Sequence, residues 1–598
     1  MRNPQSRCLL SGNEAIARGA YEAGVTVAAG YPGTPSTEIL ERLAEYSEVY
    51  AEWAPNEKVA LEVVIGASLA GARALTAMKH VGLNVAADPL MVLAYIGVKG
   101  GVVIVSADDP GMHSSQNEQD NRFYARFAQI PLLEPSDSQE AKDFASLAFW
   151  LSEEYDTPVL LRTTTRVSHG KGLVTLGERR VREVPGFRKD PAKYITLPAH
   201  ARKRHPLVLE RMQRLSRLAD EVEINRLEWG DPRIGVITSG VAYQYAKEVL
   251  PDASYLKLGL SYPLPEGRIR EFAAVVETLY VVEELEPFLE DELKARGFKV
   301  IGKEAFPRVG ELDPRLVAEG FRRAGGIFSI PRWEAVSQGE EVLPRPPVLC
   351  SGCPYLGVFY VLGKLQVITT GDIGCYTLGA FPPLSAMDTC VCMGASIGNA
   401  MGLEKALPPG SKKKVVAVIG DSTFLHSGIT GLMDAVYNKG TFTVIILDNR
   451  TTAMTGGQDH PATGVTLRGE RTKEVDLEAL CRSLGVERVR VVDPYDLGRL
   501  RGVLKEEVAA PSLSVVISRG PCILLDKAVP GPLMVNTELC NGCRLCLKLG
   551  CPSLSLLPLE GEREKGRPKA KVAIDPVTCT GCALCVELCK PMAIRARA

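Results

Sequence analysis

The chain has 598 residues, enough for several domains, and its 70 basic and 71 acidic side chains nearly cancel. This balance gives no electrostatic reason to expect nucleic acid or an anionic membrane surface as a partner. No apolar run reaches the length of about 18 residues that a spanning helix needs, and the N-terminus lacks the apolar core of a signal peptide, so we expect a cytoplasmic protein without a membrane partner.

Residues 1–185 are predicted to form an α/β domain. A short apolar strand, 25–29, leads into the turn-rich segment 30–35, whose sequence is GYPGTP. A helix should follow this rigid loop, because Thr34 and Ser36 are both of a type that caps helix N-termini.

Two further elements of this domain carry candidate functional residues. The stretch 56–78 is crowded with glycine and alanine, and we predict one long helix that lies close to neighbouring backbone or to a cofactor. The buried strand 102–106 opens into the polar loop 108–113, which contains Asp109 and His113. Loops at strand ends carry functional sites more often than other loops do.

The middle of the chain is less informative. Residues 186–230 are rich in arginine, lysine and proline, and we predict a surface linker that becomes helical from about residue 207 to 225. Residues 231–330 alternate apolar strands with helical segments and are predicted to be a second α/β domain.

A proline-rich break precedes a third predicted α/β domain, residues 346–530. Two runs rich in β-branched residues, 415–419 and 441–447, flank an amphipathic stretch, 429–437. This stretch is long enough for the crossover helix of a βαβ unit, which would make the two runs parallel strands of one sheet.

Polar residues follow both of these strands. Gly420, Asp421 and Ser422 come after the first strand, and Asp448 and Asn449 come after the second. Because open α/β sheets bind ligands at the carboxyl ends of their strands, Asp421 and Asn449 should face each other there. Carboxylate and amide oxygens suit Mg²⁺ that carries phosphate oxygens. Two ordinary strand-end turns of a nucleotide-binding domain are the alternative.

The 16 cysteines are unevenly placed, with eight in the last 59 residues. In an intracellular chain, CxxC spacings indicate metal or redox centres rather than disulfides. Taken alone, Cys350-x2-Cys353 is compatible with half a zinc site or with two structural thiols.

The tail, residues 531–598, carries the strongest motif in the chain, a repeated CxxCxxC run. The two runs resemble those of a bacterial two-cluster ferredoxin, which implies iron–sulfur clusters. Zinc is the poorer interpretation, because it needs four ligands and two such runs are an awkward surplus. The repeated cysteines are Cys540, Cys543, Cys546 and Cys551 in the first half, and Cys579, Cys582, Cys585 and Cys589 in the second.

The segment with Asp421 resembles the thiamine diphosphate motif GDG…NN. It departs from that motif at Ser422, which replaces a glycine, and at Asp448-Asn449, which replace the asparagine pair. The following residues 455–458 (TGGQ) resemble the 2-oxoacid:ferredoxin oxidoreductases more than the thiamine-dependent decarboxylases. This family resemblance implies Mg²⁺ ligands at Asp421, Asn449 and the carbonyl of Thr451, and cofactor contacts from Gly420, Asp421, Ser422, Asn449 and Gly456.

The same resemblance makes residues 1–185 a pyrimidine-binding domain. It implies that Thr34 approaches the 2-oxoacid and that Glu57 hydrogen-bonds the aminopyrimidine of thiamine diphosphate. The alternative for Glu57 is a solvated glutamate in a helix's first turn. His113 and His426 are further candidate catalytic residues, and residues 231–330 correspond to a transketolase-C-terminal-like domain with a structural role.

Three [4Fe–4S] clusters are implied by the family's cysteine layout. A proximal cluster beside thiamine would be held by Cys350, Cys353, Cys375 and Cys522. In a two-cluster ferredoxin, the fourth cysteine of each run ligates the other cluster. One tail cluster would therefore take Cys540, Cys543, Cys546 and Cys589, and the other Cys551, Cys579, Cys582 and Cys585.

The predicted fold class is therefore α/β, with several open parallel-sheet domains of the thiamine diphosphate-binding type and a small C-terminal α+β two-cluster ferredoxin domain. The domain order is similar to the large (alpha) subunits of the indolepyruvate-type members of the family. The resemblance implies oxidative decarboxylation of aryl pyruvates, such as indolepyruvate and phenylpyruvate, to acyl-CoA and CO₂. It also implies coenzyme A, an external ferredoxin and a smaller beta (gamma-type) subunit, in an alpha2beta2 assembly.

Two alternatives remain at this point. One is a pyruvate or general 2-oxoacid:ferredoxin oxidoreductase, because no stretch of sequence shows an aromatic substrate pocket. The other is a non-enzymatic electron carrier in which a ferredoxin is fused to inert α/β domains.

Overall fold

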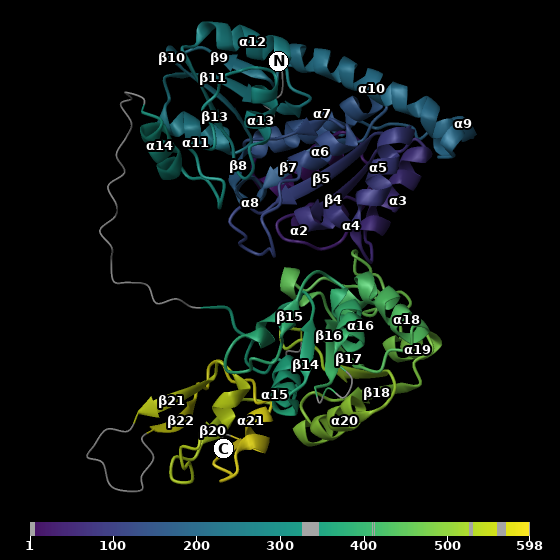
Figure 1. Cartoon of the computed structure of the whole chain (residues 1–598), viewed down its shortest axis with the longest axis vertical. Coiled ribbons are helices and arrows are strands. Elements are labelled where there is room, and N and C mark those ends of the chain that lie inside the picture. Colours follow the sequence, from purple (N-terminus) through teal and green to yellow (C-terminus); the bar gives the residue numbers. More distant parts are fainter. Residues whose placement is uncertain are drawn as a thin grey trace. The chain divides into compact units, whose positions relative to one another are not determined.

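The computed structural model describes residues 6–325, 346–408, 411, 413–525, 530–558 and 570–596. The chain forms two compact units, Met1–Gly339 and Glu340–Ala598 (Figure 1). Parallel sheets with flanking helices dominate both units, as the fold-class prediction requires. Within the described ranges, no helix has the length and apolar character needed to span a bilayer.

The first unit contains a seven-stranded sheet of order β12-β6-β7-β5-β4-β2-β3, in which only the β12–β6 pair is antiparallel. Its strands are β2 (Val27–Gly30), β3 (Tyr50–Trp53), β4 (Ala74–Lys79), β5 (Val102–Asp108), β6 (Leu132–Leu133), β7 (Val159–Thr164) and β12 (Leu260–Tyr262). A separate ribbon pairs β1 (Arg7–Ser11) with β8 (Lys171–Thr175).

Helices cover this sheet, and one of them, α3, is shorter than predicted. They are α1 (Gly12–Glu22), α2 (Thr37–Ala44), α3 (Glu57–Leu69), α4 (His80–Val85), α5 (Ala87–Ile96), α6 (Arg122–Ala128), α7 (Ser138–Glu154) and α8 (Thr165–His169). The single helix predicted over 56–78 is wrong in its second half, because the chain turns at Gly71 (φ +91°) and continues as β4. A fully buried strand has no polar alternation, so sequence periodicity does not separate it from a buried helix.

The predicted linker, residues 186–230, contains two helices, α9 (Pro191–Tyr194) and α10 (Pro198–Glu221). Helix α10 begins earlier than the expected residue 207. Its buried residues include Val208 and Leu215, and the buried Arg211 donates hydrogen bonds to the main-chain carbonyls of Ala94 and Asp156. The basic character of this segment therefore serves partly to attach it to the first unit.

A four-stranded sheet of order β13-β10-β11-β9 completes the first unit. It comprises β9 (Arg226–Glu228), β10 (Asp231–Ser239), β11 (Ala253–Leu258) and β13 (Thr278–Val282), with helices α11 (Ala242–Val249), α12 (Glu266–Val275), α13 (Phe288–Ala295) and α14 (Pro314–Arg323). Because β12 comes from this part of the chain and pairs with β6, the two sheets are joined directly.

The second unit is built on a parallel six-stranded sheet of order β15-β14-β16-β17-β19-β18. Its elements are β14 (Ile368–Gly371), β15 (Thr389–Cys390), β16 (Val415–Gly420), β17 (Thr443–Asp448), β18 (Arg488–Val492), β19 (Ser514–Arg519), α15 (Tyr355–Leu365), α16 (Ala395–Ala406), α17 (Asp421–Thr423), α18 (Ile429–Tyr437), α19 (Leu477–Ser483) and α20 (Leu497–Ala509). The predicted βαβ unit, β16–α18–β17, is confirmed.

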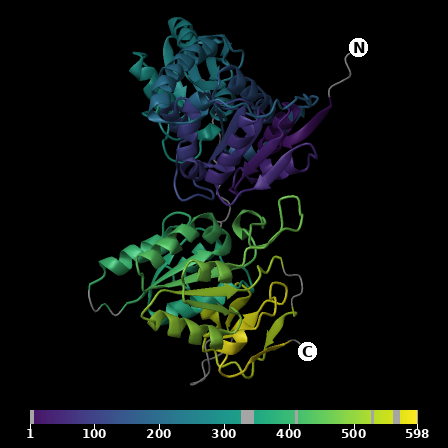
Figure 2. The ribbon, with the colours of Figure 1, turned by 90° about the vertical axis from the view of Figure 1, so that its right-hand side faces the viewer.

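Helices lie on both faces of this sheet (Figure 2). Both faces are apolar, as expected for a parallel sheet between helix layers. Val416 and Val418 point into a core shared with α15 and α20. Ala417 and Ile419, the alternate residues of the same strand, point into a core shared with α16, α18 and α19. This sandwich fixes the carboxyl ends of β16 and β17 relative to each other.

The tail adds a small α+β module to the second unit. Its antiparallel pairs are β20 (Leu533–Val535) with β23 (Ile594–Ala596) and β21 (Leu554–Pro558) with β22 (Ala570–Ile574), and α21 spans Leu584–Leu588. Leu549, Leu584 and Ile594 belong to the same apolar core as the α15 and α20 side of the sheet. The tail module is therefore packed onto the sheet domain.

Candidate functional site

Asp421 and Asn449 lie together at the carboxyl edge of the six-stranded sheet. The Asp421 carboxylate, 2% exposed, accepts hydrogen bonds from the main-chain N–H groups of Ser422 and Arg450, both at 2.8 Å. The second bond joins the end of β16 to the end of β17. Asn449 Oδ1 accepts a hydrogen bond from the N–H of Thr451 at 3.3 Å. Asn449 and Thr451 therefore share the turn after β17, and the bond from Arg450 ties this turn to Asp421 at the end of β16.

The loop after Asn449 folds back on itself beside this edge. The N–H of Thr452 donates to the carbonyl of Gln458 at 2.9 Å, and the Thr452 hydroxyl donates to Ser422 Oγ at 2.8 Å. Gly456 has φ +127°, a conformation that side chains rarely adopt. The TGGQ segment therefore closes a compact loop against the end of β16.

Two neighbours of Asp421 were not predicted. His460 is buried, and its Nε2 lies 3.3 Å from Asp421 Oδ2. Its Nδ1 accepts the N–H of Ala462. Tyr376 packs on Gly420, where an added Cβ would lie 2.7 Å from the ring. The sequence offered no signal for either contact, because both side chains reach the site from distant loops.

The proposed ligands at this edge fit a hard cation, because all of them are oxygen atoms. Main-chain N–H groups hold the carboxylate of Asp421 in a fixed position. Asp448, the preceding residue, is paired with Arg519 at 2.7 Å, while burial and the charge of Asp421 raise its pKa. His426 is also buried, and its Nδ1 hydrogen-bonds the hydroxyl of its neighbour Ser427 at 2.6 Å.

The four cysteines proposed for the proximal cluster gather in the second unit. Burial raises the pKa of Cys353, and the thiols of Cys350, Cys375 and Cys522 raise it further. Burial likewise raises the pKa of Cys375 to about 11, with contributions from Cys522 and Cys350. The N–H of Cys522 donates to the carbonyl of Asn449 at 2.9 Å, so this cysteine group adjoins the proposed Mg²⁺ site.

The tail cysteines form two groups. One group, which lines a small pocket, consists of Cys540, Cys543, Cys546 and Cys589. In the other group, burial raises the pKa of Cys585 to about 12, with further contributions from Cys582, Cys551 and Cys579. The structure therefore brings the eight cysteines together in the two interleaved sets that were predicted.

These cysteine groups suit iron–sulfur clusters, because a [4Fe–4S] cluster spreads four thiolates around a cubane. The N–H of Ala593 also donates to Cys589 Sγ at 3.2 Å, the kind of bond that tunes cluster potentials.

The loop that carries Cys350 and Cys353 packs against both the segment before α20 and the tail module. The Tyr495 hydroxyl donates to the carbonyl of Gly352 at 2.8 Å, and the Ser553 hydroxyl donates to Ser351 at 2.7 Å. Gly352 has φ +73°, and a Cβ there would lie 2.1 Å from the hydroxyl oxygen of Thr580. This close approach places the proximal cysteine loop directly beside the second CxxCxxC run.

In the first unit, the two loops proposed to lie on the substrate side follow β2 and β5, the strands on either side of β4. Segment 31–36 follows β2, and loop 108–113 follows β5, with the end of β4 at Lys79 between them. Ser36 occupies the N-cap position of α2, but its hydroxyl donates to the carbonyl of Gly33 instead of capping the helix.

Glu57 is the first residue of α3 and is only 5% exposed. A Cβ placed on Gly82 would lie 2.6 Å from Glu57 Oε1, so the carboxylate lies against the start of α4. This burial excludes the alternative of a solvated helix-end glutamate. Thr34 lies in the neighbouring loop, partly exposed, with a cis peptide bond to Pro35.

The His113 loop is held by residues far away in sequence. Glu118 Oε1 accepts hydrogen bonds from the N–H groups of Gly111 at 2.6 Å and Gly310 at 2.9 Å. The exposed His113 ring lies 3.4 Å from Glu311, which also pairs with Arg166 at 2.5 Å. The segment around residue 310 therefore positions a loop of the preceding domain.

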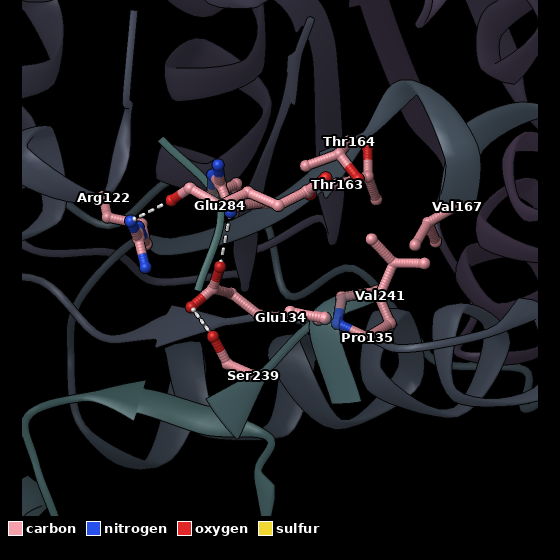
Figure 3. Close-up of a pocket in the computed structure, with 12 residues that line it drawn as sticks. Arg122, Glu134, Pro135, Thr163, Thr164, Val167, Ser239, Val241 and Glu284 are labelled. Atoms are coloured by element: carbon pink, nitrogen blue, oxygen red, sulfur yellow. Dashed lines mark hydrogen bonds and ion pairs between the residues drawn. The ribbon is translucent and has the colours of Figure 1, made fainter. Parts of the chain in front are cut away.

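An enclosed polar pocket lies between the two sheets of the first unit (Figure 3). Arg122 donates to the carbonyl of Glu284 at 2.9 Å, while Glu134 accepts bonds from Arg162 at 2.6 Å and Ser239 at 3.0 Å. Burial raises the pKa of Glu284 to about 7. Because the lining comes from both sheets, these contacts join the two sheets.

Three family models match the chain. Residues 18–222 match a pyruvate flavodoxin/ferredoxin oxidoreductase thiamine diphosphate-binding domain. Residues 372–518 match the C-terminal TPP-binding domain of thiamine pyrophosphate enzymes, and residues 533–590 match a 4Fe-4S dicluster domain. The first and second models cover Glu57 and Asp421, respectively, and the third covers all eight tail cysteines.

Relatives match over nearly the full length. The chain is 43% identical to the indolepyruvate oxidoreductase subunit IorA of Archaeoglobus fulgidus, over 98% of this chain and 97% of that protein. It is 44% identical to the subunit of the same name from Methanothermobacter marburgensis, with the same coverage. The 2-oxoglutarate synthase subunit KorA of Methanothermobacter thermautotrophicus is 28% identical over 50% of this chain and 94% of that protein.

Proposed function

The chain belongs to the family of indolepyruvate oxidoreductase subunits IorA, and we propose that it carries the cofactors of an enzyme that oxidatively decarboxylates aryl pyruvates, such as indolepyruvate and phenylpyruvate, to acyl-CoA and CO₂. It is a thiamine diphosphate-dependent oxidoreductase with [4Fe–4S] clusters. The observation that carries the proposal is the match over 98% of the chain to proteins of one named activity.

Thiamine diphosphate, when bound, supplies a carbanion that attacks the keto carbon and a ring that accepts the electron pair left by departing CO₂. The chain's own residues provide the anchors. We assign Asp421, Asn449 and the carbonyl of Thr451 to Mg²⁺ and the diphosphate. Their oxygen atoms are buried together at two hydrogen-bonded strand ends and suit this cation as ligands. Glu57 would hold the aminopyrimidine, since its carboxylate is buried at a strand-end edge.

Iron–sulfur clusters, when bound, accept single electrons, which matches the two one-electron transfers to ferredoxin that this reaction requires. The cysteine groups supply a continuous route through the second unit. Cys522 adjoins Asn449, Gly352 contacts Thr580, and the set with Cys543 lies at the surface. We propose that electrons leave through this last set to an external ferredoxin.

The partners follow from the same family. The relatives are named as subunits, which supports a multi-subunit enzyme. We propose a smaller beta (gamma-type) subunit, an alpha2beta2 assembly, and coenzyme A as the acyl acceptor.

A general 2-oxoacid oxidoreductase is the second candidate, because half of the chain is also similar to a 2-oxoglutarate synthase subunit. An anaerobic assay separates the two. The purified chain, its partner subunit and coenzyme A should reduce ferredoxin with indolepyruvate and phenylpyruvate at higher kcat/KM than with pyruvate or 2-oxoglutarate. Preference for either small 2-oxoacid would favour the second candidate, and absence of turnover with every 2-oxoacid would reject both.

A further inference from the structure

Lys79, the last residue of β4, touches both of the proposed substrate-side loops. A Cβ placed on Gly33 would lie 3.1 Å from Lys79 Cβ. At the other end of the side chain, Nζ donates a hydrogen bond to the carbonyl of Ser114 at 2.5 Å. The ammonium group therefore lies at the carboxyl edge of the sheet, where the loops after β2, β4 and β5 meet.

The nearby carboxylate of Asp109, whose charge acts on Lys79, is occupied by other partners. It accepts hydrogen bonds from the N–H of Ser114 at 2.9 Å and from the hydroxyls of Ser115 at 2.5 Å and Thr165 at 2.8 Å. Within the described residues Lys79 forms no ion pair. Its ammonium group donates to the carbonyl of Ser114 and, at 3.4 Å, to the hydroxyl of the same residue, which leaves one of its three N–H groups for a ligand.

Burial lowers the pKa of the Lys79 ammonium group to about 8, although the charge of Asp109 acts in the opposite direction. The side chain therefore still carries its charge at neutral pH. A partly desolvated ammonium without a carboxylate partner gains more from a ligand carboxylate than an exposed lysine does, because charge-assisted hydrogen bonds strengthen as water is excluded.

We propose that Lys79 binds the carboxylate of the 2-oxoacid substrate. This inference rests on the proposed function, which supplies a substrate with a carboxylate. The neighbouring Gly82 packs on the Glu57 carboxylate, so the lysine and the proposed cofactor-binding glutamate share one edge of the sheet. A carboxylate fixed by Lys79 would leave the keto carbon on the side where Glu57 holds the cofactor.

A purely structural role, tying the Ser114 loop to β4, is the competing explanation. Lys79→Gln distinguishes the two, because glutamine keeps a donor for a carbonyl but loses the charge. Lys79→Arg keeps the charge. Lys99→Gln is the matched control, since Lys99 also donates to a loop carbonyl, of Gly186 at 2.8 Å, but precedes β5 at the amino end of the sheet.

The holoenzyme with its partner subunit should show a KM for aryl pyruvate raised by about 10- to 100-fold in Lys79→Gln, the range expected when one hydrogen bond to a charged group is lost. Lys79→Arg should stay within about threefold of the parent, and Lys99→Gln should be unchanged. Thiamine diphosphate content and iron content should be equal in all four proteins.

Binding of unreactive analogues gives a readout that is independent of turnover. The parent should bind a 3-arylpropionate more tightly than the matching 3-arylpropionamide, and Lys79→Gln should lose this preference while Lys79→Arg keeps it. An unchanged KM and an unchanged preference in Lys79→Gln would overturn the assignment of Lys79. A parent that oxidises no 2-oxoacid would instead overturn the proposed function, so the two failures are distinguishable.

Discussion

Glu57 shows how the fold can supply a physical reason for a residue that family resemblance selects. Several glutamates lie in the same stretch, and the burial of Glu57 beneath Gly82 distinguishes it from the exposed Glu62, which pairs with Lys58. The family resemblance selected Glu57, and the structure supplies a physical reason for the choice. A carboxylate that is withdrawn from water and faces a cofactor-binding edge can act on a bound ring.

Glu57→Gln should therefore bind thiamine diphosphate nearly normally and lose activity. The amide keeps the size and a hydrogen-bonding oxygen, but it cannot accept a proton from the aminopyrimidine. Proton-transfer groups of this kind contribute on the order of 10²- to 10⁴-fold in rate. Steady-state kcat, measured alongside cofactor content, checks this expectation; a loss below about threefold would remove Glu57 from the catalytic machinery.

Asp421 is the residue on which the diphosphate anchor depends. Asp421→Ala should lose Mg²⁺ and with it tight binding of thiamine diphosphate, because the remaining ligands are one amide oxygen and one carbonyl. Iron content should be unchanged, since no cysteine is altered. Asp434→Ala, which removes an exposed carboxylate from α18, is the control. Unaltered cofactor affinity in Asp421→Ala would contradict the metal assignment.

The loop that contains His113 is an element whose position depends on a distant domain. Glu118 joins the N–H groups of Gly111 and Gly310, and these residues lie far apart in the sequence. The predicted transketolase-C-terminal-like domain therefore does more than pack against its neighbour, because its residues 310–311 hold a loop at the proposed substrate side.

Glu118→Ala should loosen this loop. Each hydrogen bond to a charged acceptor contributes about 1.5–3 kcal/mol when buried, and less here because Glu118 is partly exposed. Hydrogen–deuterium exchange should accelerate in residues 109–119 and around Gly310, with global unfolding nearly unchanged. Glu45→Ala, which removes an exposed carboxylate paired with Arg42, should leave both segments as protected as in the parent.

Elements differ in how far the sequence alone predicts them. The unit β16–α18–β17 was predicted closely, because β-branched runs and an amphipathic helix have distinct periodicities. Strand β4 was missed, because its residues 74–79 are all apolar or small apart from the last and continue the pattern of α3. The N-terminal half of α10 was missed because its composition is strongly basic, although the fold provides carbonyl partners for Arg204.

Across the whole molecule, local motifs could be predicted from the sequence, whereas contacts between distant segments could not. The CxxC spacings confine the tail cysteines to short loops, so their two sets follow from the sequence once the ferredoxin pattern is recognised. The contacts of His460 with Asp421, Tyr495 with Gly352, and Lys79 with Ser114 join residues from separate loops. Such contacts depend on how the sheets and loops pack, and no local sequence pattern predicts them.

Substitution of Cys375 tests whether the molecule holds three clusters or two. It opens a short 3₁₀ turn after β14, and its pKa is raised by burial and by the thiols of Cys522 and Cys350. If these thiols hold a proximal cluster with Cys353, Cys375→Ser should lower iron by up to about four atoms per chain. The tail module should keep its clusters, because its cysteines form separate groups.

Thiamine diphosphate binding should survive in Cys375→Ser, since Asp421 and Asn449 are untouched, while reduction of external ferredoxin should collapse. Cys481→Ser is the matched control, because Cys481 is also buried in the second unit but lies in the core beneath α19. Iron analysis and EPR must accompany the kinetics, because cluster potentials vary over roughly −700 to +450 mV with their surroundings and an altered cluster can fail without leaving. A fully reconstituted parent with about eight irons per chain would contradict the proximal cluster and leave Cys350 and Cys353 as a structural pair beside the tail module.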